Sequence, residues 1–180
     1  MRWLKIILGS ILALVVLAVT SLWLAGMRES AGRTEAQTVI NKPAAEIMPW
    51  VIEPDKLKQW VGGFVSSKDI SNIGMKVGTM GETVVADPNR PDVRFTLQDE
   101  LTAYEPGKLI ELKISSPGAF HGTVRYELSE AAGATTVTFK GQFEYDQWWA
   151  RLMEPLITPS AQKKSEEDLA RLKKAVEAAK

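Results

Sequence analysis

The stretch Pro43-Ala-Ala-Glu-Ile47-Met-Pro-Trp-Val51-Ile-Glu53-Pro54-Asp-Lys-Leu57-Lys-Gln-Trp60 decides the fold of this 180-residue chain. It follows a short apolar run, Ala36–Ile40, which is typical of a strand. Apolar residues then recur at helical spacings on both sides of Pro54, which interrupts a continuous helix. The pattern predicts two short helices, directly after the first strand, whose apolar faces close over another part of the molecule.

Downstream of Gly62-Gly63, the chain offers six more strand-like runs separated by turn residues. The expected strands are Phe64–Ile70, Met80–Ala86, Val93–Tyr104, Lys108–Ser115, Phe120–Leu128 and Thr135–Tyr145. With the first strand they make about seven, and their short connections favour antiparallel hairpins.

Strict alternation gives the sheet one apolar and one polar face. Ile110, Leu112 and Ile114 alternate with Glu111, Lys113 and Ser115, and the last two strands repeat the pattern. A sheet with a single apolar face needs a cover. The C-terminus supplies it, because Leu169, Leu172 and Val176 recur three or four residues apart in an expected helix that begins at Pro159 with Thr158 as its cap. Pro155 predicts a kink or a separate turn before that helix.

These elements resemble the START-related domains of the SRPBCC superfamily, which includes polyketide cyclase-like proteins. In that family a first strand precedes Pro-x-x-x-Val-Trp-x-x-Leu-x-Asp-Pro-x-x-Leu-x-x-Trp, positions held here by Ile47, Met48, Val51, Glu53, Pro54, Leu57 and Trp60, with Met48 and Glu53 departing from the commonest residues. Further matches are Gly78-Thr79, Tyr104–Leu109 and Asp168–Lys173.

The resemblance covers Thr34–Lys180 and implies an α+β helix-grip (START-like) fold. In that fold a long C-terminal helix lies across a curved antiparallel sheet and encloses an apolar cavity. For this chain we expect about seven strands, two short helices and the long helix, preceded by one transmembrane helix.

The segment from Ile6 to Met27 carries no charged side chain and is long enough, as a helix, to span a bilayer. Trp3 and Trp23 lie near its two ends, and Arg2 and Lys5 precede it, which favours a cytoplasmic N-terminus. We therefore expect residues 1–29 to be a single-pass anchor in the cell membrane and residues 30–180 to be an extracytoplasmic domain, on the periplasmic side if the source is a Gram-negative bacterium. A cleaved signal peptide is the alternative, although Ala25-Gly26-Met27 is a poor cleavage site.

Composition excludes several classes of function. The formal net charge is zero and no basic stretch is interleaved with aromatic residues, so we expect no nucleic-acid partner. The chain has no cysteine and one histidine, His121, which alternation places on the polar face. We therefore expect no metal site and no cofactor.

Asp99 is the acid of most interest. It shares the strand parity of apolar neighbours and would point inward with them, where burial raises a carboxyl pKa. These neighbours are Val93, Phe95, Leu97, Leu101 and Ala103. A β-bulge, or a place near the end of the strand, would return Asp99 to water. The expected lining of the cavity is Trp60, Phe95, Leu97, Asp99, Leu112, Val124, Tyr126, Phe139, Phe143 and Trp149. No pair of residues identifies a catalytic centre, so whether the protein is an enzyme stays open.

The function that follows is a membrane-tethered domain that binds a hydrophobic small molecule or lipid between the sheet and the C-terminal helix. One alternative is an enzyme resembling polyketide cyclases or dehydratases, with Asp99 or a tyrosine moving protons. Another is a protein-interaction module resembling the domains that activate a heat-shock ATPase.

Overall fold

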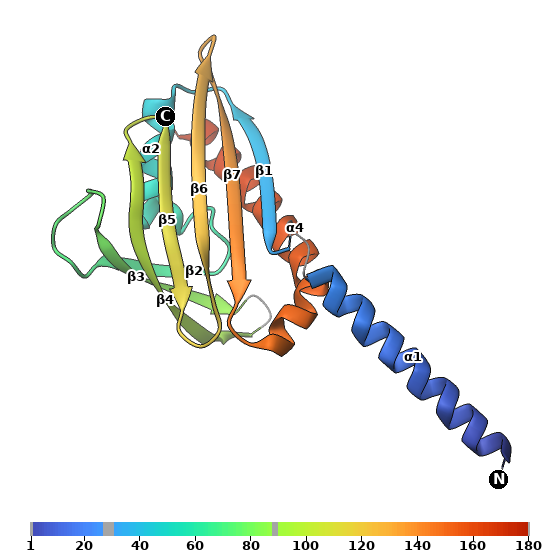
Figure 1. Ribbon diagram of the computed structural model, residues 1–180. Coiled ribbons are helices and arrows are strands. Elements are labelled where there is room, and N and C mark those ends of the chain that lie inside the picture. Colours follow the sequence, from blue (N-terminus) through green and yellow to red (C-terminus); the bar gives the residue numbers. More distant parts are fainter. Residues whose placement is uncertain (1, 27–30, 88–89, 180) are drawn as a thin grey trace.

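The last six strands of the sheet form consecutive hairpins, as predicted, and the first strand pairs with the last. The computed structural model describes residues 2–26, 31–87 and 90–179. Within them seven antiparallel strands lie in the order β1-β7-β6-β5-β4-β3-β2 (Figure 1). The strands are β1 (Arg33–Ile40), β2 (Phe64–Asp69), β3 (Met80–Asp87), β4 (Arg90–Glu105), β5 (Leu109–Ser116), β6 (Phe120–Ala131) and β7 (Ala134–Tyr145). All seven predicted strands are confirmed, with ends shifted by at most three residues.

The β6–β7 hairpin shows how local residue chemistry sets the register. Ala131 pairs with Ala134, so the loop consists of Ala132 and Gly133 alone. Both have positive φ, 51° and 79°, which is the conformation of the two-residue turn whose twist matches that of a hairpin. This turn fixes the alternation of β6 and β7, and with it the inward position of Tyr126 and Phe139.

The two predicted short helices are present. They are α2 (Ala44–Ile52) and α3 (Pro54–Leu57), and Glu53 stands between them in an extended conformation. Ile47, Met48 and Val51 on α2 are buried in the core. The Nε1 of Trp60 donates to the carbonyl of Trp50 over 2.8 Å, which ties the end of this segment back to α2.

The long C-terminal helix differs from the prediction. It runs without interruption as α4 (Trp148–Ala178), with Pro155 and Pro159 inside it, rather than starting at Pro159. Thr158 is therefore not a cap; its hydroxyl donates to Glu154 over 2.5 Å within the helix. The bend that Pro155 predicts is visible in Figure 1, where the first turns of α4 run in a different direction from the rest. A proline removes one backbone hydrogen bond and kinks a helix without necessarily ending it.

The second part of α4 lies over the inner face of the sheet, beside β1. Leu169, Leu172 and Val176 are its buried residues there, as their spacing predicts. Asp168 is also buried: it accepts a hydrogen bond from the backbone N–H of Gly62 over 3.0 Å and forms ion pairs with Lys164 and Arg171. These contacts fix α4 against the segment that follows α3.

The apolar N-terminal segment forms the helix α1 (Arg2–Gly26), which extends away from the rest of the protein (Figure 1). Ile6–Gly26 is long and apolar enough to cross a membrane, a test that a signal sequence also passes. The expected boundary between an anchor of residues 1–29 and a domain of residues 30–180 lies outside the described residues, as does Met27 at the end of the uncharged run.

Candidate functional site

The inner face of the sheet is divided into two halves that differ in how completely they are covered. We call one the core half; its inner residues are Leu101, Ile110, Leu128 and Val137, all at most 6 % exposed. We call the other the open half; its inner residues are Phe95, Leu97, Asp99, Ile114, Phe120, Phe143 and Tyr145, none of which is fully buried. Leu112 and Val124 lie where the two halves meet.

The core half is a packed interior. Trp60 is 1 % exposed and meets the ring of Tyr126 edge-on, with 6.0 Å between the ring centroids. Tyr126 in turn packs against Phe139, with 5.1 Å between the ring centroids. Burial, and secondarily the charge of Asp168, raises the pKa of the Tyr126 hydroxyl. Trp60, Tyr126, Phe139 and Leu112 were predicted as cavity lining; the structure places all four in or against this core.

The open half is shaped by glycines on its inner face. Gly122 and Gly141 lie on neighbouring strands, and a Cβ on Gly122 would lie 2.6 Å from the ring of Phe143. A Cβ on Gly141 would lie 3.0 Å from the same ring. Because glycine has no side chain, these two positions leave room for the ring of Phe143 to lie across the sheet. There it meets Phe120 edge-on, with 5.8 Å between the ring centroids. An aromatic pair therefore forms the floor of the open half next to β6 and β7.

Asp99 is the charged residue within this apolar surround. It pairs with Gly81 on β3 and Ile114 on β5, and its carboxyl occupies the space that a side chain on Gly81 would need. The Thr83 hydroxyl donates to Asp99 Oδ2 over 2.9 Å and lies 3.1 Å from the Ser67 hydroxyl. Burial raises the pKa of the Asp99 carboxyl, and the hydrogen bond from Thr83 lowers it by a smaller amount.

The β-bulge that could have turned Asp99 outward exists, but it lies beyond it. The register of β4 and β5 shifts between Leu101 and Ala103. Leu101 faces inward opposite Leu112, whereas Ala103 lies opposite Glu111 on the outer face, contrary to the parity prediction. Thr102 lies on that outer face too, and its hydroxyl donates to Glu111 over 2.9 Å. Asp99 precedes the bulge and so keeps its inward direction.

The remaining predicted residues are not brought together with Asp99 to the same degree. Leu97 and Phe143 share the open half with Asp99, and Val124 is buried at the border of that half. Phe95 lies on the inner face of β4, but its side chain is 45 % exposed. Trp149 lies on α4 and is 56 % exposed, on a side of the helix turned away from Ala150 and Glu154, which are buried.

Two residues of the site were missed by the sequence interpretation. Thr83 and Ser67 lie on β3 and β2 and supply the hydroxyl groups beside Asp99. The signal was Gly81, since a glycine inside a strand often marks the close approach of another group. His121 lies on the outer face as predicted, with Nδ1 3.0 Å from Asp146. Among the described residues, no three His, Asp or Glu side chains gather as they would around a metal ion.

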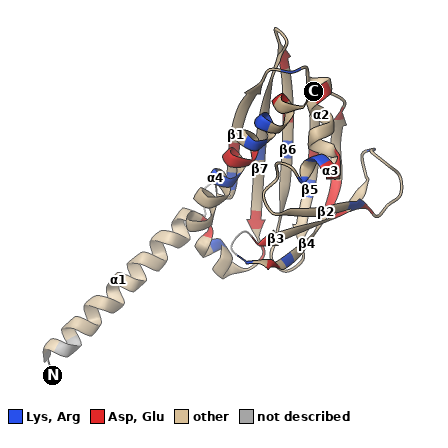
Figure 2. Cartoon of the chain, turned by 180° about the vertical axis from the view of Figure 1, so that it is seen from behind, with Lys and Arg blue, Asp and Glu red and all other residues tan. Residues whose placement is uncertain are grey.

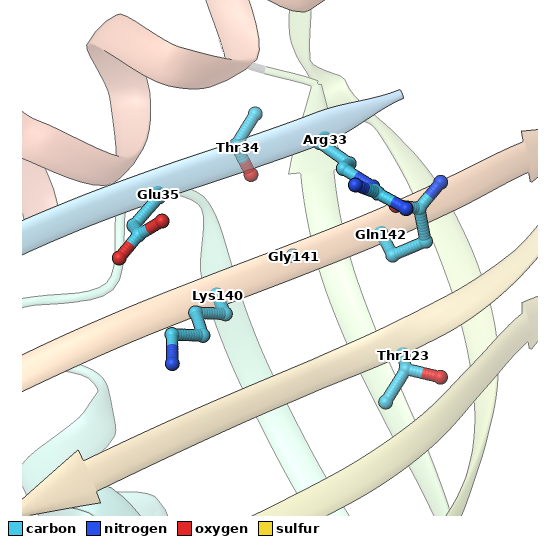
Figure 3. A pocket seen from close by; sticks show the side chains of 7 residues that line it. All are labelled: Arg33, Thr34, Glu35, Thr123, Lys140, Gly141 and Gln142. Carbon is cyan, nitrogen blue, oxygen red and sulfur yellow. The ribbon is translucent and has the colours of Figure 1, made fainter. Parts of the chain in front are cut away.

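A separate depression of about 400 Å³ lies on the outer face of the sheet, across β1, β6 and β7. Figure 3 shows Arg33 reaching over to Gln142, and its Nε donates to Gln142 Oε1 over 2.6 Å. Lys140, which also lines the depression, forms an ion pair with Glu127, with 2.8 Å between Nζ and Oε2. Because these polar groups already have partners and the surface is remote from Asp99, the candidate site is the open half.

Comparisons with known proteins agree with this architecture. The fold is similar to that of a protein from Chromobacterium violaceum (TM-score 0.63, 14 % identity, covering 82 % of this chain and 99 % of that one). It is also similar to a conserved protein from Geobacillus kaustophilus (TM-score 0.64, 11 % identity, covering 80 % and 94 %). DynU16, a protein in the dynemicin biosynthetic locus, has a TM-score of 0.59 at 18 % identity, covering 82 % of this chain and 48 % of its own.

No relative was found among the curated proteins. Residues 31–177, however, match the family described as polyketide cyclase / dehydrase and lipid transport. The match extends from the residues before β1 almost to the end of α4, and so contains both halves of the inner face. With its helix-grip fold, the chain belongs to this family of the START-related SRPBCC superfamily.

Proposed function

We propose that the protein is a membrane-tethered domain that binds a mainly apolar small molecule or lipid against the open half of its sheet. The observation that carries the proposal is the contrast within one inner face: the core half is sealed, while the open half keeps partly exposed apolar side chains around Asp99. Exposed apolar surface next to a few convergent polar groups is typical of small-molecule sites. Membership of a family that includes lipid transport supports the same reading.

The polar groups limit the chemistry of the ligand. Thr83 already donates to Asp99 Oδ2, so the other carboxylate oxygen is the acceptor available to a ligand. A molecule with an apolar body and one hydroxyl or amine would bury its body on Leu97, Phe120 and Phe143 while donating to Asp99. A molecule without any donor would leave a desolvated carboxyl beside it, which costs free energy.

The tether is the second element of the proposal. α1 supplies a segment, Ile6–Gly26, with the length and apolar character to hold the domain at a membrane. An anchored carrier or sensor meets apolar molecules at the surface where they concentrate. We place the domain on the extracytoplasmic side, following the basic residues Arg2 and Lys5 that precede the span Ile6–Gly26.

Native mass spectrometry of the full chain, released from detergent micelles and followed by extraction of bound molecules, tests the proposal. The matched variants are Leu97→Lys, on the inner face of β4, and Thr96→Lys, on the exposed outer face of the same strand. We expect an apolar adduct on the unmodified chain and on Thr96→Lys, and its loss from Leu97→Lys. Equal adducts on both variants, or none on any form, would contradict binding at the open half.

A proton-transferring enzyme similar to polyketide cyclases is the second candidate, favoured by the raised pKa of Asp99 in a partly apolar site. An acid with a raised pKa can exchange protons closer to neutral pH. Asp99→Asn separates the two functions: an enzyme loses turnover while a pure binding domain changes only its affinity. The readout is conversion of the extracted ligand, compared with its retention by the same variant.

A further inference from the structure

The outward face of the first turns of α4 is apolar where a solvent-facing helix would be polar. Trp148 is 75 % exposed, and Trp149 and Leu156 are 56 % exposed. Met153 and Ile157 are also exposed. The buried residues of these turns, Ala150 and Glu154, lie on the side of the helix turned away from Trp148, Trp149 and Leu156, and Ile157 borders on that side. Contiguous exposed apolar residues of this kind mark an interaction surface. We call Trp148, Trp149, Met153, Leu156 and Ile157 the apolar face of α4.

The same side of α4 changes character after Thr158. Continuing the helical spacing from Trp149 and Leu156 leads to Lys163, Glu167 and Lys174, which are exposed and charged. Figure 2 shows charged residues following one another along the second part of α4, whereas α1 is uncharged over most of its length. The apolar face is therefore confined to the turns next to α1.

Backbone contacts place those turns at the end of α1. A Cβ on Gly26, the last residue of α1, would lie 2.6 Å from the carbonyl oxygen of Arg151, so the two backbones touch. Pro155, four residues later, has no N–H to bond that carbonyl, which leaves it free for such an approach. Trp148 and Ile157 are then only about 5 Å and about 9 Å along the helix from this contact.

The start of the folded domain is held to the same turns. The backbone N–H of Gly32 donates to Glu154 Oε1 over 2.7 Å, and the carbonyl of Gly32 accepts from the N–H of Phe143 over 3.0 Å. Gly32 has a φ of +69°, and a side chain there would collide with the carbonyl of Phe143. In Figures 1 and 2 the first turns of α4 run crosswise to α1, while the second part continues away from it.

We propose that the apolar face of α4 docks on the surface of the bilayer in which α1 is embedded. A helix lying in the interface buries its apolar side about 5–10 Å into the headgroup and acyl boundary. The apolar face of α4 lies within about 9 Å, along the helix, of the end of α1, which is where an embedded α1 would leave the bilayer. Tryptophan is favoured at that depth because its ring is apolar and its N–H is polar. Docking gives the domain a fixed orientation instead of leaving it free on its tether.

The orientation has a consequence for the proposed ligand site. β1 begins, β7 ends and β6 begins at the end of the sheet nearest to α1, and that end carries Phe120 and Tyr145 of the open half. A domain docked through α4 therefore directs the open half toward the bilayer. Its ligands would then be molecules taken directly from the membrane. The docking proposal rests on the proposed function in its use of α1 as a tether.

Site-directed fluorescence on the full chain in vesicles of phosphatidylcholine and phosphatidylglycerol tests the docking. Since the chain contains no cysteine, a single introduced one carries the only label. Labels at Trp149→Cys, Met153→Cys and Leu156→Cys report on the apolar face, and Lys163→Cys and Lys174→Cys are matched controls farther along the same side of α4. A label at Leu14→Cys reports on the tether itself.

We expect lipids with a nitroxide near the headgroup to quench the three labels on the apolar face several times more strongly than the two controls. Iodide in the water should show the reverse order. The triple change Trp148→Ser, Trp149→Ser, Leu156→Glu should remove lipid quenching of a label at Met153→Cys, while a label at Leu14→Cys stays quenched by lipids with a deep nitroxide.

Three other outcomes would overturn the docking. Iodide quenching of Leu156→Cys equal to that of Lys163→Cys, with Leu14→Cys quenched from the lipid, would leave the tether intact and the apolar face in water. Protection of the apolar face from both quenchers would show that a second copy of the protein covers it. A label at Leu14→Cys that no lipid quenches would remove the tether, and with it the membrane part of the proposed function.

Discussion

The core half and the open half of the inner face use aromatic side chains in opposite ways. In the core half Trp60 and Tyr126 meet edge to face; Trp60 is 1 % exposed and its N–H donates to the carbonyl of Trp50, and Tyr126 packs against the buried core cluster. In the open half Phe120 and Phe143 meet in nearly the same geometry but stay partly exposed. Apolar and polar residues alternate along the strands in the same way in both halves. The halves differ in how completely helices cover their inner face. Alternation therefore defines an apolar face, whereas the covering helices decide whether a part of that face becomes core or binding site.

The largest expected effect comes from opening the core half. Trp60→Ala removes a fully buried ring, its contact with Tyr126 and its hydrogen bond to Trp50. We expect the free energy of unfolding to fall by about 3–5 kcal/mol, the cost typical of large core truncations. Chemical denaturation of the full chain in detergent, followed by circular dichroism, measures it. Phe120→Ala in the open half is the control; an equal loss from that variant would contradict the division into two halves.

A smaller effect follows from filling the open half. Gly141→Ala places a methyl group 2.7 Å from the hydroxyl oxygen of Thr34 and 3.0 Å from the ring of Phe143, so these two side chains must move. We expect a loss of about 1–3 kcal/mol, as for other overpacked sites, together with weaker retention of the apolar adduct. Thermal unfolding and native mass spectrometry give the two readouts. Gly9→Ala on α1, where a Cβ meets no neighbouring atom and φ is not positive, is the control and should weaken neither readout. If the adduct were retained in full, Phe143 would not belong to the binding surface.

The smallest expected change has the opposite sign. Burial raises the pKa of Asp99 in the folded protein, so the folded state holds its proton more tightly than the unfolded chain. The charged carboxyl therefore weakens the fold at neutral pH, and this penalty disappears as the pH falls through the raised pKa toward the ordinary value of 3.8. Asp99→Asn should stabilise the free protein at pH 7, by less than about 1 kcal/mol because solvent screens the part-exposed group.

The measurement is the unfolding free energy as a function of pH for both forms of the protein. The stability advantage of Asp99→Asn should shrink as the pH is lowered. Thr96→Asn, on the exposed outer face of the same strand, is the control and should leave the pH profile unchanged. A variant that is less stable than the original chain at pH 7 would show that Asp99 stabilises the fold rather than serving a ligand.

Much of the fold was predictable because it depends on short-range pattern. The seven strands follow from alternation, and the break at Pro54 from the geometry of proline. The errors came where backbone geometry depends on contacts distant in sequence. The bulge at Thr102 turned Ala103 outward, and contacts with Gly26 and Gly32 accompany a helix that continues through Pro155 and Pro159.

The candidate site was predictable only in part for the same reason. Parity placed Asp99 inward, yet its partners Thr83 and Ser67 come from two other strands, and no local pattern joins them to it. Trp149 was expected to line the cavity because it is apolar and near the covering helix. The direction in which it points depends on how α4 bends over β1 and α1, and that is a tertiary property.

By itself, the sequence determined the elements of this protein: an apolar helix long enough for a membrane, seven strands with one apolar face, two short helices and a covering helix. These depend on residue periodicity and turn chemistry, which act over a few residues. Only the tertiary structure decided which part of the apolar face is sealed, where Asp99 finds its hydroxyl partners, and that the apolar turns of α4 lie at the end of α1. Those features arise from contacts between residues such as Gly26 and Arg151, or Thr83 and Asp99, which chain spacing does not specify.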